Sequence, residues 1–109
     1  MPDKVEKIRA LNDCFRKSLN GGRVVITRGV HALGPVRLQR LVNAVRTFNA
    51  FGPDNDPHGE HDFGAFDDGG ERFFWKIDYY DPQMNGHSPD PADLKVTRRV
   101  LTVMLAEEY

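Results

Sequence analysis

The side chains best suited to chemistry are the histidines and carboxylates of residues 58–62, His-Gly-Glu-His-Asp. His58 and His61 stand three residues apart, and imidazole and carboxylate groups are common ligands of zinc, manganese and iron. The spacing differs from the HExxH arrangement, which places two histidines one helical turn apart, and Gly59 disfavours a helix. A metal site here would be completed by a nearby side chain: Asp54, Asp56, Asp78, Asp81 or His87.

Two interpretations without a metal stay open for the same cluster. His61 and Asp62 are typical of a loop that leads into a strand, where polar side chains bond backbone groups. Asp78 and Asp81 could instead form paired carboxylates with His61 as a general base. The simpler alternative is that Asp78 pairs with Lys76 or an arginine, while Asp81 starts a turn. The sequence predicts no catalytic residue and no cofactor.

Aromatic residues gather in the following stretch, residues 63–80, in a number that exceeds what one sheet face can bury. Tyrosine and tryptophan are enriched at binding hot spots. Either Phe74, Tyr80 and their neighbours form part of a protein-binding surface, or a helix covers them. The predicted partner-binding residues are therefore the acidic and aromatic side chains of this region: Asp54, Asp56, Glu60, His61, Asp62, Asp67, Phe74, Asp78, Tyr80 and Asp81.

A β-hairpin is the element expected to position these side chains. Residues 61–66 and 71–80 read as strands, and Asp67-Asp68-Gly69-Gly70 is a glycine-containing loop of the kind that closes a hairpin. Side chains alternate between the faces of a strand. One face of the second strand is expected to meet the helices: Phe73, Trp75, Ile77 and Tyr79. The other face is mixed, which suggests a surface that is partly covered or used.

Two amphipathic helices are predicted before the hairpin. Residues 3–20 repeat apolar side chains at three or four positions, with Asp3 and Glu6 as a capping box and two glycines after Asn20 as the stop signal. The single cysteine, Cys14, falls on the apolar side and is expected to be buried. Residues 35–49 form the second helix, with Gly34 at the cap and Pro35 at the first helical position.

A third helix is predicted over residues 91–107, after an N-cap at Asp90. Its apolar side carries Leu94, Leu101 and Leu105, and Arg98 falls on the same side, where it would snorkel or pair with an acidic loop residue. With residues 23–28 as a short strand, the fold class is α+β in the order α-β-α-β-β-α. The sheet is expected to be three-stranded, mostly antiparallel and packed by three helices.

The length of 109 residues predicts one domain, residues 1–109. The first residues, MPDKVEK, contain no apolar signal region, and the apolar runs are too short to span a bilayer. A lone cysteine fits a reducing compartment. We therefore expect a cytoplasmic protein without a membrane partner.

Charge is distributed unevenly along the chain. Residues 1–50 carry ten Lys or Arg and three Asp or Glu, a balance of +7, whereas residues 51–109 carry five and thirteen, a balance of −8. The two halves either complement each other within one fold or present opposite faces to a charged partner or a second copy. Arg37 and Arg46 lie on opposite sides of their predicted helix, so a continuous basic stripe for nucleic acid is not expected.

Four strings of the sequence carry a resemblance: GEHDFG (59–64), FFWKIDYYD (73–81), SPDPAD (88–93) and VTRRVLTVMLAEEY (96–109). With them the chain resembles a bacterial family of roughly 100-residue proteins of unknown function, common on plasmids and genomic islands of proteobacteria. The resemblance implies no established activity and no catalytic residue. It does imply a mobile genetic element, where small proteins often bind and inhibit host defence machinery.

Two functions are therefore predicted. The first is a non-enzymatic interaction protein that inhibits a host nucleic-acid defence complex, of the anti-CRISPR or anti-restriction type, by placing its acidic loops and aromatic face against a basic groove. Direct binding of nucleic acid is not expected, and self-association is left open. The alternative is a metal-dependent hydrolase or nuclease centred on His58, His61 and Asp62.

Overall fold

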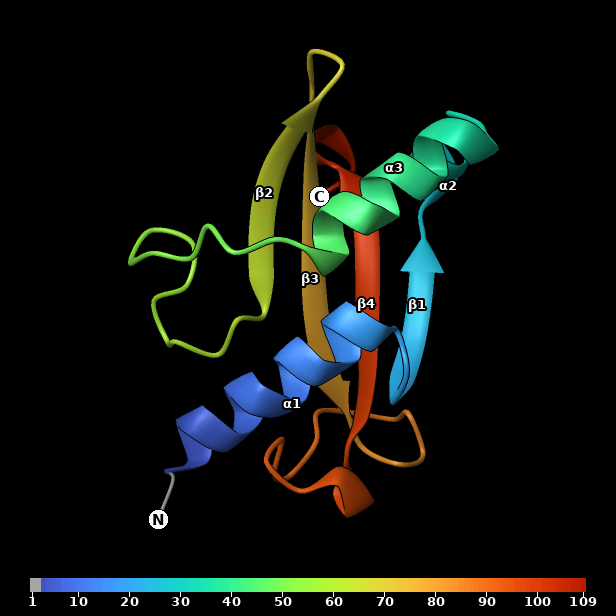
Figure 1. Cartoon of the computed structure of the whole chain (residues 1–109). Coiled ribbons are helices and arrows are strands. Elements are labelled where there is room, and N and C mark those ends of the chain that lie inside the picture. The colour runs from blue at the N-terminus through green and yellow to red at the C-terminus, as the bar shows by residue number, and fades with distance from the viewer. Residues whose placement is uncertain (1–2) are drawn as a thin grey trace.

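A mixed four-stranded sheet forms the centre of the computed structural model, which describes residues 3–109 (Figure 1). Its strands lie in the order β1-β4-β3-β2; their bounds are β1 Gly22–Ile26, β2 Phe63–Asp68, β3 Glu71–Tyr80 and β4 Arg98–Leu105. β1 runs parallel to β4, and the other two pairs are antiparallel. The predicted α+β class is confirmed, but the sheet has four strands, not three, and is mixed.

Three α-helices accompany the sheet: α1 Lys4–Ser18, α2 Arg28–His31 and α3 Pro35–Arg46. Both longer helices, α1 and α3, lie on the same face of the sheet (Figure 1). The short α2 falls where the sequence predicted only a connection. Because the helices share one side, the sheet has a helix-covered face and an opposite face, which we call the open face.

The predicted helix over residues 91–107 is wrong. Most of that stretch is β4, preceded only by the single 3₁₀ turn η1 (Leu94–Val96), whose first backbone amides are capped by Asp93 and not Asp90. β4 lies between β1 and β3, and its side chains are largely buried on both faces. Such a strand reads as a continuous apolar run, which periodicity alone does not distinguish from a buried helix. The inward position predicted for Arg98 is also wrong: Arg98 is exposed and Arg99 is buried.

The hairpin is confirmed with a shift of two residues in its first strand, since β2 spans Phe63–Asp68 and not residues 61–66. Asp68 pairs with Glu71, so Gly69 and Gly70 alone make the turn. Both have positive φ angles, 59° and 82°, as the two-residue turns favoured in hairpins require. The predicted alternation of β3 is confirmed: Phe73, Trp75, Ile77 and Tyr79 are buried on the helix-covered face.

The start of α1 is as predicted, because the Asp3 side chain accepts a hydrogen bond of 2.8 Å from the Glu6 backbone amide. Its end differs, since Leu19 and not a glycine takes the left-handed conformation that closes the helix. The prediction of a buried Cys14 is wrong: the thiol is exposed. The buried side of α1 is instead formed by Ile8, Asn12, Phe15 and Arg16, so two polar residues occupy positions that an apolar stripe would fill.

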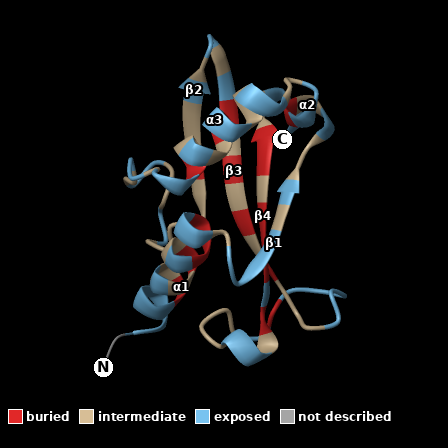
Figure 2. Ribbon diagram, turned by 45° about the vertical axis from the view of Figure 1, so that its right-hand side comes forward, coloured by how far each residue is buried: buried red, intermediate tan, exposed pale blue. Residues whose placement is uncertain are grey.

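α3 begins as predicted, with Gly34 at the cap and Pro35 at the first position, and ends at Arg46, three residues before the predicted end. Its Leu41 and Val45 pack into the hydrophobic core, whose central members are the side chains of β3 and β4 (Figure 2). Among the helices of residues 3–109, none is long and apolar enough to cross a membrane.

The basic and acidic halves of the chain meet where α3 packs against the hairpin. Arg37 pairs with Asp68 and Glu71, at 3.2 and 2.7 Å, and Arg40 pairs with Asp68 at 2.6 Å. The hydrogen bonds from Arg40 are the main reason that the pKa of Asp68 falls from 3.8 to about 2. At this contact the two charge halves complement each other within the fold.

Candidate functional site

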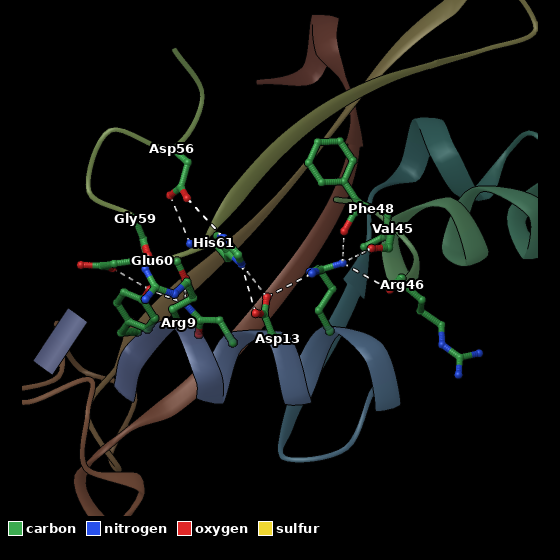
Figure 3. A network of polar contacts seen from close by, with 12 residues as sticks. Arg9, Asp13, Val45, Arg46, Phe48, Asp56, Gly59, Glu60 and His61 are labelled. Carbon is green, nitrogen blue, oxygen red and sulfur yellow. Dashed lines mark hydrogen bonds and ion pairs between the residues drawn. The ribbon is translucent and has the colours of Figure 1, made fainter. Parts of the chain in front are cut away.

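The predicted His-Asp cluster lies in the loop between α3 and β2, where a polar network fastens the loop to α1 (Figure 3). The His61 imidazole stacks on Phe51, with ring centroids 3.7 Å apart and planes 4° from parallel. Its Nδ1 atom lies 2.8 Å from an Asp13 carboxylate oxygen, and its Nε2 atom lies 3.7 Å from Asp56. Both ring nitrogens thus face carboxylates. His61 holds a positive φ of 55°, a strained conformation for a residue with a side chain.

Backbone bonding explains part of the cluster, as one interpretation of the sequence expected. The His61 amide donates to Asp56 at 3.1 Å, and the Asp62 carbonyl accepts from the Ile77 amide at 2.9 Å. His58 is exposed, and the two histidine side chains are not part of one ligand set. Within the described part of the chain, no three His, Cys, Asp or Glu side chains converge as they would around a metal ion.

A second part of the network is buried between α1, β3 and β4. Asn12 donates to the Tyr79 hydroxyl at 2.7 Å and accepts from Arg99 Nε at 2.7 Å. Tyr79 donates onward to the Glu60 carboxylate at 2.8 Å. Burial is the main cause that raises the pKa of Tyr79 and lowers the pKa of Arg99. Glu60, predicted to meet a partner, is therefore bound within the fold.

Arg16 ties the network to α3. Although only 1% exposed, it donates to the carbonyls of Val45, Arg46 and Phe48 at 2.8 to 3.2 Å, at and just beyond the end of the helix. Asp13 accepts from its other terminal nitrogen at 3.1 Å. These partners of the cluster were not predicted from the sequence: Asn12, Asp13, Arg16 and Arg99. The available signal was the presence of Asn12 and Arg16 within an otherwise apolar helical stripe.

The open face carries the other predicted residues. The strand registers place the following side chains on it: Arg23 and Val25 from β1, Phe63, Ala65 and Asp67 from β2, Phe74, Lys76, Asp78 and Tyr80 from β3, and Arg98, Val100, Thr102 and Met104 from β4. Val100 and Met104, on the central strand, are buried by their neighbours. The outer members are partly or fully exposed. Aromatic, aliphatic and charged side chains therefore alternate across one accessible surface.

Three rings pack together on this face: Phe63, Phe74 and Tyr109, which we call the aromatic cluster. The Phe74 and Tyr109 ring centroids are 5.6 Å apart in an edge-to-face arrangement, and Phe63 lies 5.2 Å from Phe74. Tyr109 remains 76% exposed. Tyr109 was not predicted to lie on this surface, because the sequence indicated a helix that ends before it.

Three predicted residues, Asp62, Asp78 and Tyr80, line one cavity of about 320 Å³ together with His87. Burial, followed by the charge of Glu60, raises the pKa of Asp62. Asp78 pairs with Lys76 at 3.0 Å, as the simpler interpretation of the sequence expected. His87 donates from Nδ1 to the Ser88 carbonyl at 2.8 Å.

The remaining predicted residues lie apart from this cavity. Asp67 pairs with Arg72 at 3.0 Å at the hairpin tip. Asp81 accepts from the Asn85 amide at 2.9 Å and so holds a turn, again as the simpler interpretation expected. Asp54 is exposed in the loop before β2. The predicted site thus separates into a loop anchored inside the fold and a set of side chains on the open face.

These features define a small α+β protein with a mixed sheet that is covered by helices on one face. The chain belongs to the family described as "Protein of unknown function (DUF3768)", whose family model matches residues 26–108. The matched residues include three of the four strings that carried the resemblance, and all but the last residue of the fourth. The chain matches no curated protein and no solved structure.

Proposed function

We propose that this protein is a non-enzymatic binding module that receives another protein on its open face. One observation supports this most directly. The structure describes six exposed large hydrophobic side chains, of which Val25 and Tyr109 lie on the open face and Met84 and Leu94 border a cavity at its end. Exposed apolar side chains on one face of a sheet are typical of interaction surfaces.

The composition of the open face agrees with protein recognition. Tyrosine, phenylalanine, methionine and arginine are enriched in the buried centres of interfaces, and all four occur there. The aromatic cluster offers rigid area with little conformational entropy to lose on binding. The loop carboxylates suit a partner less well, because Asp56 and Glu60 bond His61 and Tyr79.

The test compares the open face with the helix-covered side. The chain is immobilised, partners are captured from the native host and identified by mass spectrometry, and the affinity of the purified partner is then measured. We expect the double substitution Val25→Ser and Tyr109→Ser to weaken binding by roughly 30-fold, which corresponds to about 2 kcal/mol. Val36→Ser is the matched control, since Val36 is 78% exposed on α3.

Equal affinities for the two variants would remove the open face from consideration. Aromatic rings beside basic groups also suit single-stranded nucleic acid, so a labelled oligonucleotide is titrated in parallel. If the oligonucleotide binds in a saturable way and the Val25/Tyr109 variant does not bind it, the partner of the open face is nucleic acid and not a protein.

We further propose that the partner belongs to a host nucleic-acid defence complex. This proposal rests on the resemblance to a family of proteins that are common on mobile genetic elements. A captured partner with no role in nucleic-acid processing would contradict it.

A further inference from the structure

A second cavity lies at the end of the open face where β1 and β4 begin. It has a volume of about 450 Å³, within the range of about 300–1,000 Å³ typical of small-molecule sites. Arg23 and Arg98 line it from adjacent strands, and Val100 lies on the same face, directly opposite Arg23 and two residues after Arg98. Met84 and Leu94, from the segment between β3 and β4, complete its border.

The two arginines are unusual among the arginines of this chain. Seven of the ten use their side chains in hydrogen bonds or ion pairs within the described residues: Arg9, Arg16, Arg37, Arg40, Arg46, Arg72 and Arg99. Arg23, Arg28 and Arg98 make no such contact with residues 3–109 and are exposed. Two of these three guanidinium groups border one cavity, and its lining contains no carboxylate to neutralise them.

The backbone lets β1 begin close against β4 beside this cavity. A Cβ atom on Gly22 would lie 2.6 Å from the Arg99 carbonyl oxygen and 2.7 Å from the Phe15 ring, so only glycine fits there. Gly21 has a φ of 102°, which a larger residue rarely adopts. The Gly-Gly pair, which the sequence analysis took only as a helix stop, also allows β1 to begin close against β4 directly before Arg23.

The apolar border is held in an unfavourable conformation. Met84 has a φ of 60°, one of three positive values among the described non-glycine residues, and its amide donates to the Asp81 carbonyl at 2.9 Å. Its side chain is 43% exposed, and that of Leu94 is 57% exposed. Strain of this kind persists where the surrounding structure enforces it, and it often marks a ligand site.

We propose that this cavity binds an organic anion, with its carboxylate or phosphate group held by Arg23 and Arg98 and its aliphatic portion against Met84, Leu94 and Val100. Arginine matches both oxyanions because its planar group donates two parallel hydrogen bonds. Met84, Leu94 and Val100 give the lining an aliphatic part, so an anion that carries a chain of methylene groups fits it better than a bare inorganic ion. The site shares Met84 and Leu94 with the surface proposed to meet a protein partner, whereas the aromatic cluster takes no part in it.

The experiment is an NMR titration of the full chain, labelled with ¹⁵N, using three probes: inorganic phosphate, hexanoate and hexyl phosphate. We expect the Gly22, Arg23 and Val100 amides to shift in a saturable way with at least one alkyl probe. That probe should bind about tenfold more tightly than inorganic phosphate, which corresponds to about 1.4 kcal/mol. Comparison of the two alkyl probes assigns the preferred oxyanion as carboxylate or phosphate.

Variants separate the specific site from general electrostatic attraction. The double substitution Arg23→Gln and Arg98→Gln should weaken alkyl-probe binding at least tenfold, whereas Arg28→Gln, the matched control at the third unpaired arginine, should leave it unchanged. Leu94→Ser should reduce the preference for the alkyl chain. Unchanged chemical shifts with every probe, equal effects of the Arg28 and Arg23/Arg98 substitutions, or inorganic phosphate binding as tightly as both alkyl probes would each overturn the proposal. Amide spectra without ligand verify that each variant is folded.

Discussion

Phe73 and Phe74 are neighbours on β3 with the same side chain and opposite surroundings. Phe73 points towards the helices and is completely buried beside Phe66 and Arg37. Phe74 points to the open face and packs edge-to-face against the exposed Tyr109. The difference shows that aromatic content alone does not indicate a binding surface, since part of it builds the core and only the remainder is available to a partner.

Polar groups on the two sides of the sheet differ in the same manner. On the helix-covered side, Asn12, Arg16 and Arg99 are buried and tied into a network that joins α1 to α3, β3 and β4. On the open face, Lys76 and Asp78 pair while remaining 37% and 39% exposed. An exposed pair of this type adds little stability, whereas a buried polar group must be bonded. Polar contacts therefore position the helices on one side and leave charge accessible on the other.

The largest contrast is expected from truncating the two phenylalanines. Phe73→Ala should lower the free energy of unfolding by about 3–5 kcal/mol because it opens a cavity in the core. Phe74→Ala should lower it by about 1 kcal/mol, since its ring is only partly buried. Urea denaturation monitored by circular dichroism measures both values. Similar losses for the two variants would show that the open face is part of the core.

Neighbouring arginines on β4 provide a second contrast. Arg99→Met should lower the free energy of unfolding by about 1–3 kcal/mol, because Asn12 and the Pro91 carbonyl lose their buried donor. Arg98→Met should change it by no more than about 0.5 kcal/mol. The same denaturation experiment applies. A stability loss at Arg98 equal to that at Arg99 would contradict the assignment of their side chains to opposite faces.

Acid should distinguish the neighbouring carboxylates of β2. The folded pKa of Asp68 is about 2, below its ordinary 3.8, so its contribution is present above about pH 4 and is lost as the pH falls towards 2. Asp68→Asn should therefore be less stable than the wild type at pH 6, and the difference should shrink as the pH falls through about 2 and vanish below it. Asp67→Asn, which removes a more exposed pair with Arg72, should show a smaller effect. Thermal melts at several pH values measure this difference, and a difference at pH 2 as large as that at pH 6 would disprove the prediction.

The smallest effect on stability is expected from substituting Asp62, because burial raises the pKa of this carboxyl group in the folded protein. Its contribution to stability is fully present below the ordinary pKa of 3.8 and is lost as the pH rises through the higher folded value. Asp62→Asn should thus raise the melting temperature at pH 7, and the gain should shrink towards pH 4. Asp54→Asn, in the exposed part of the same loop, is the control. A lower melting temperature for Asp62→Asn at pH 7 would indicate a stabilising contact for the carboxylate.

The hairpin could be predicted from the sequence because its signals are local. The alternation of residues 71–80 sets which side chains face the helices, and Gly69-Gly70 can adopt the positive φ angles of a tight turn. The cap of α1 at Asp3 is local in the same sense. The roles of Asp78 and Asp81 were likewise predicted as one alternative, since a pair between residues two apart on one strand face and a turn are both set by near neighbours.

The environment of His61 could not be predicted, because its partner Asp13 lies 48 positions earlier in the chain. The same applies to Asn12 and Arg99, which are 87 positions apart. A sequence pattern reports the chemistry of a side chain and its neighbours, whereas such pairs exist only after α1 has packed on the sheet. The cavity with Arg23 and Arg98 also requires two strands to meet.

By itself, the sequence determined the elements with a distinct local period or cap: α1, the hairpin and the start of α3. The tertiary structure decided that residues 98–105 form a strand, because their apolar run suits a buried helix as well as a buried strand. Pairing with β1 on one side and β3 on the other satisfies the backbone hydrogen bonds of β4 and buries both of its faces. That non-local pairing also decided which aromatic and charged side chains lie on the open face.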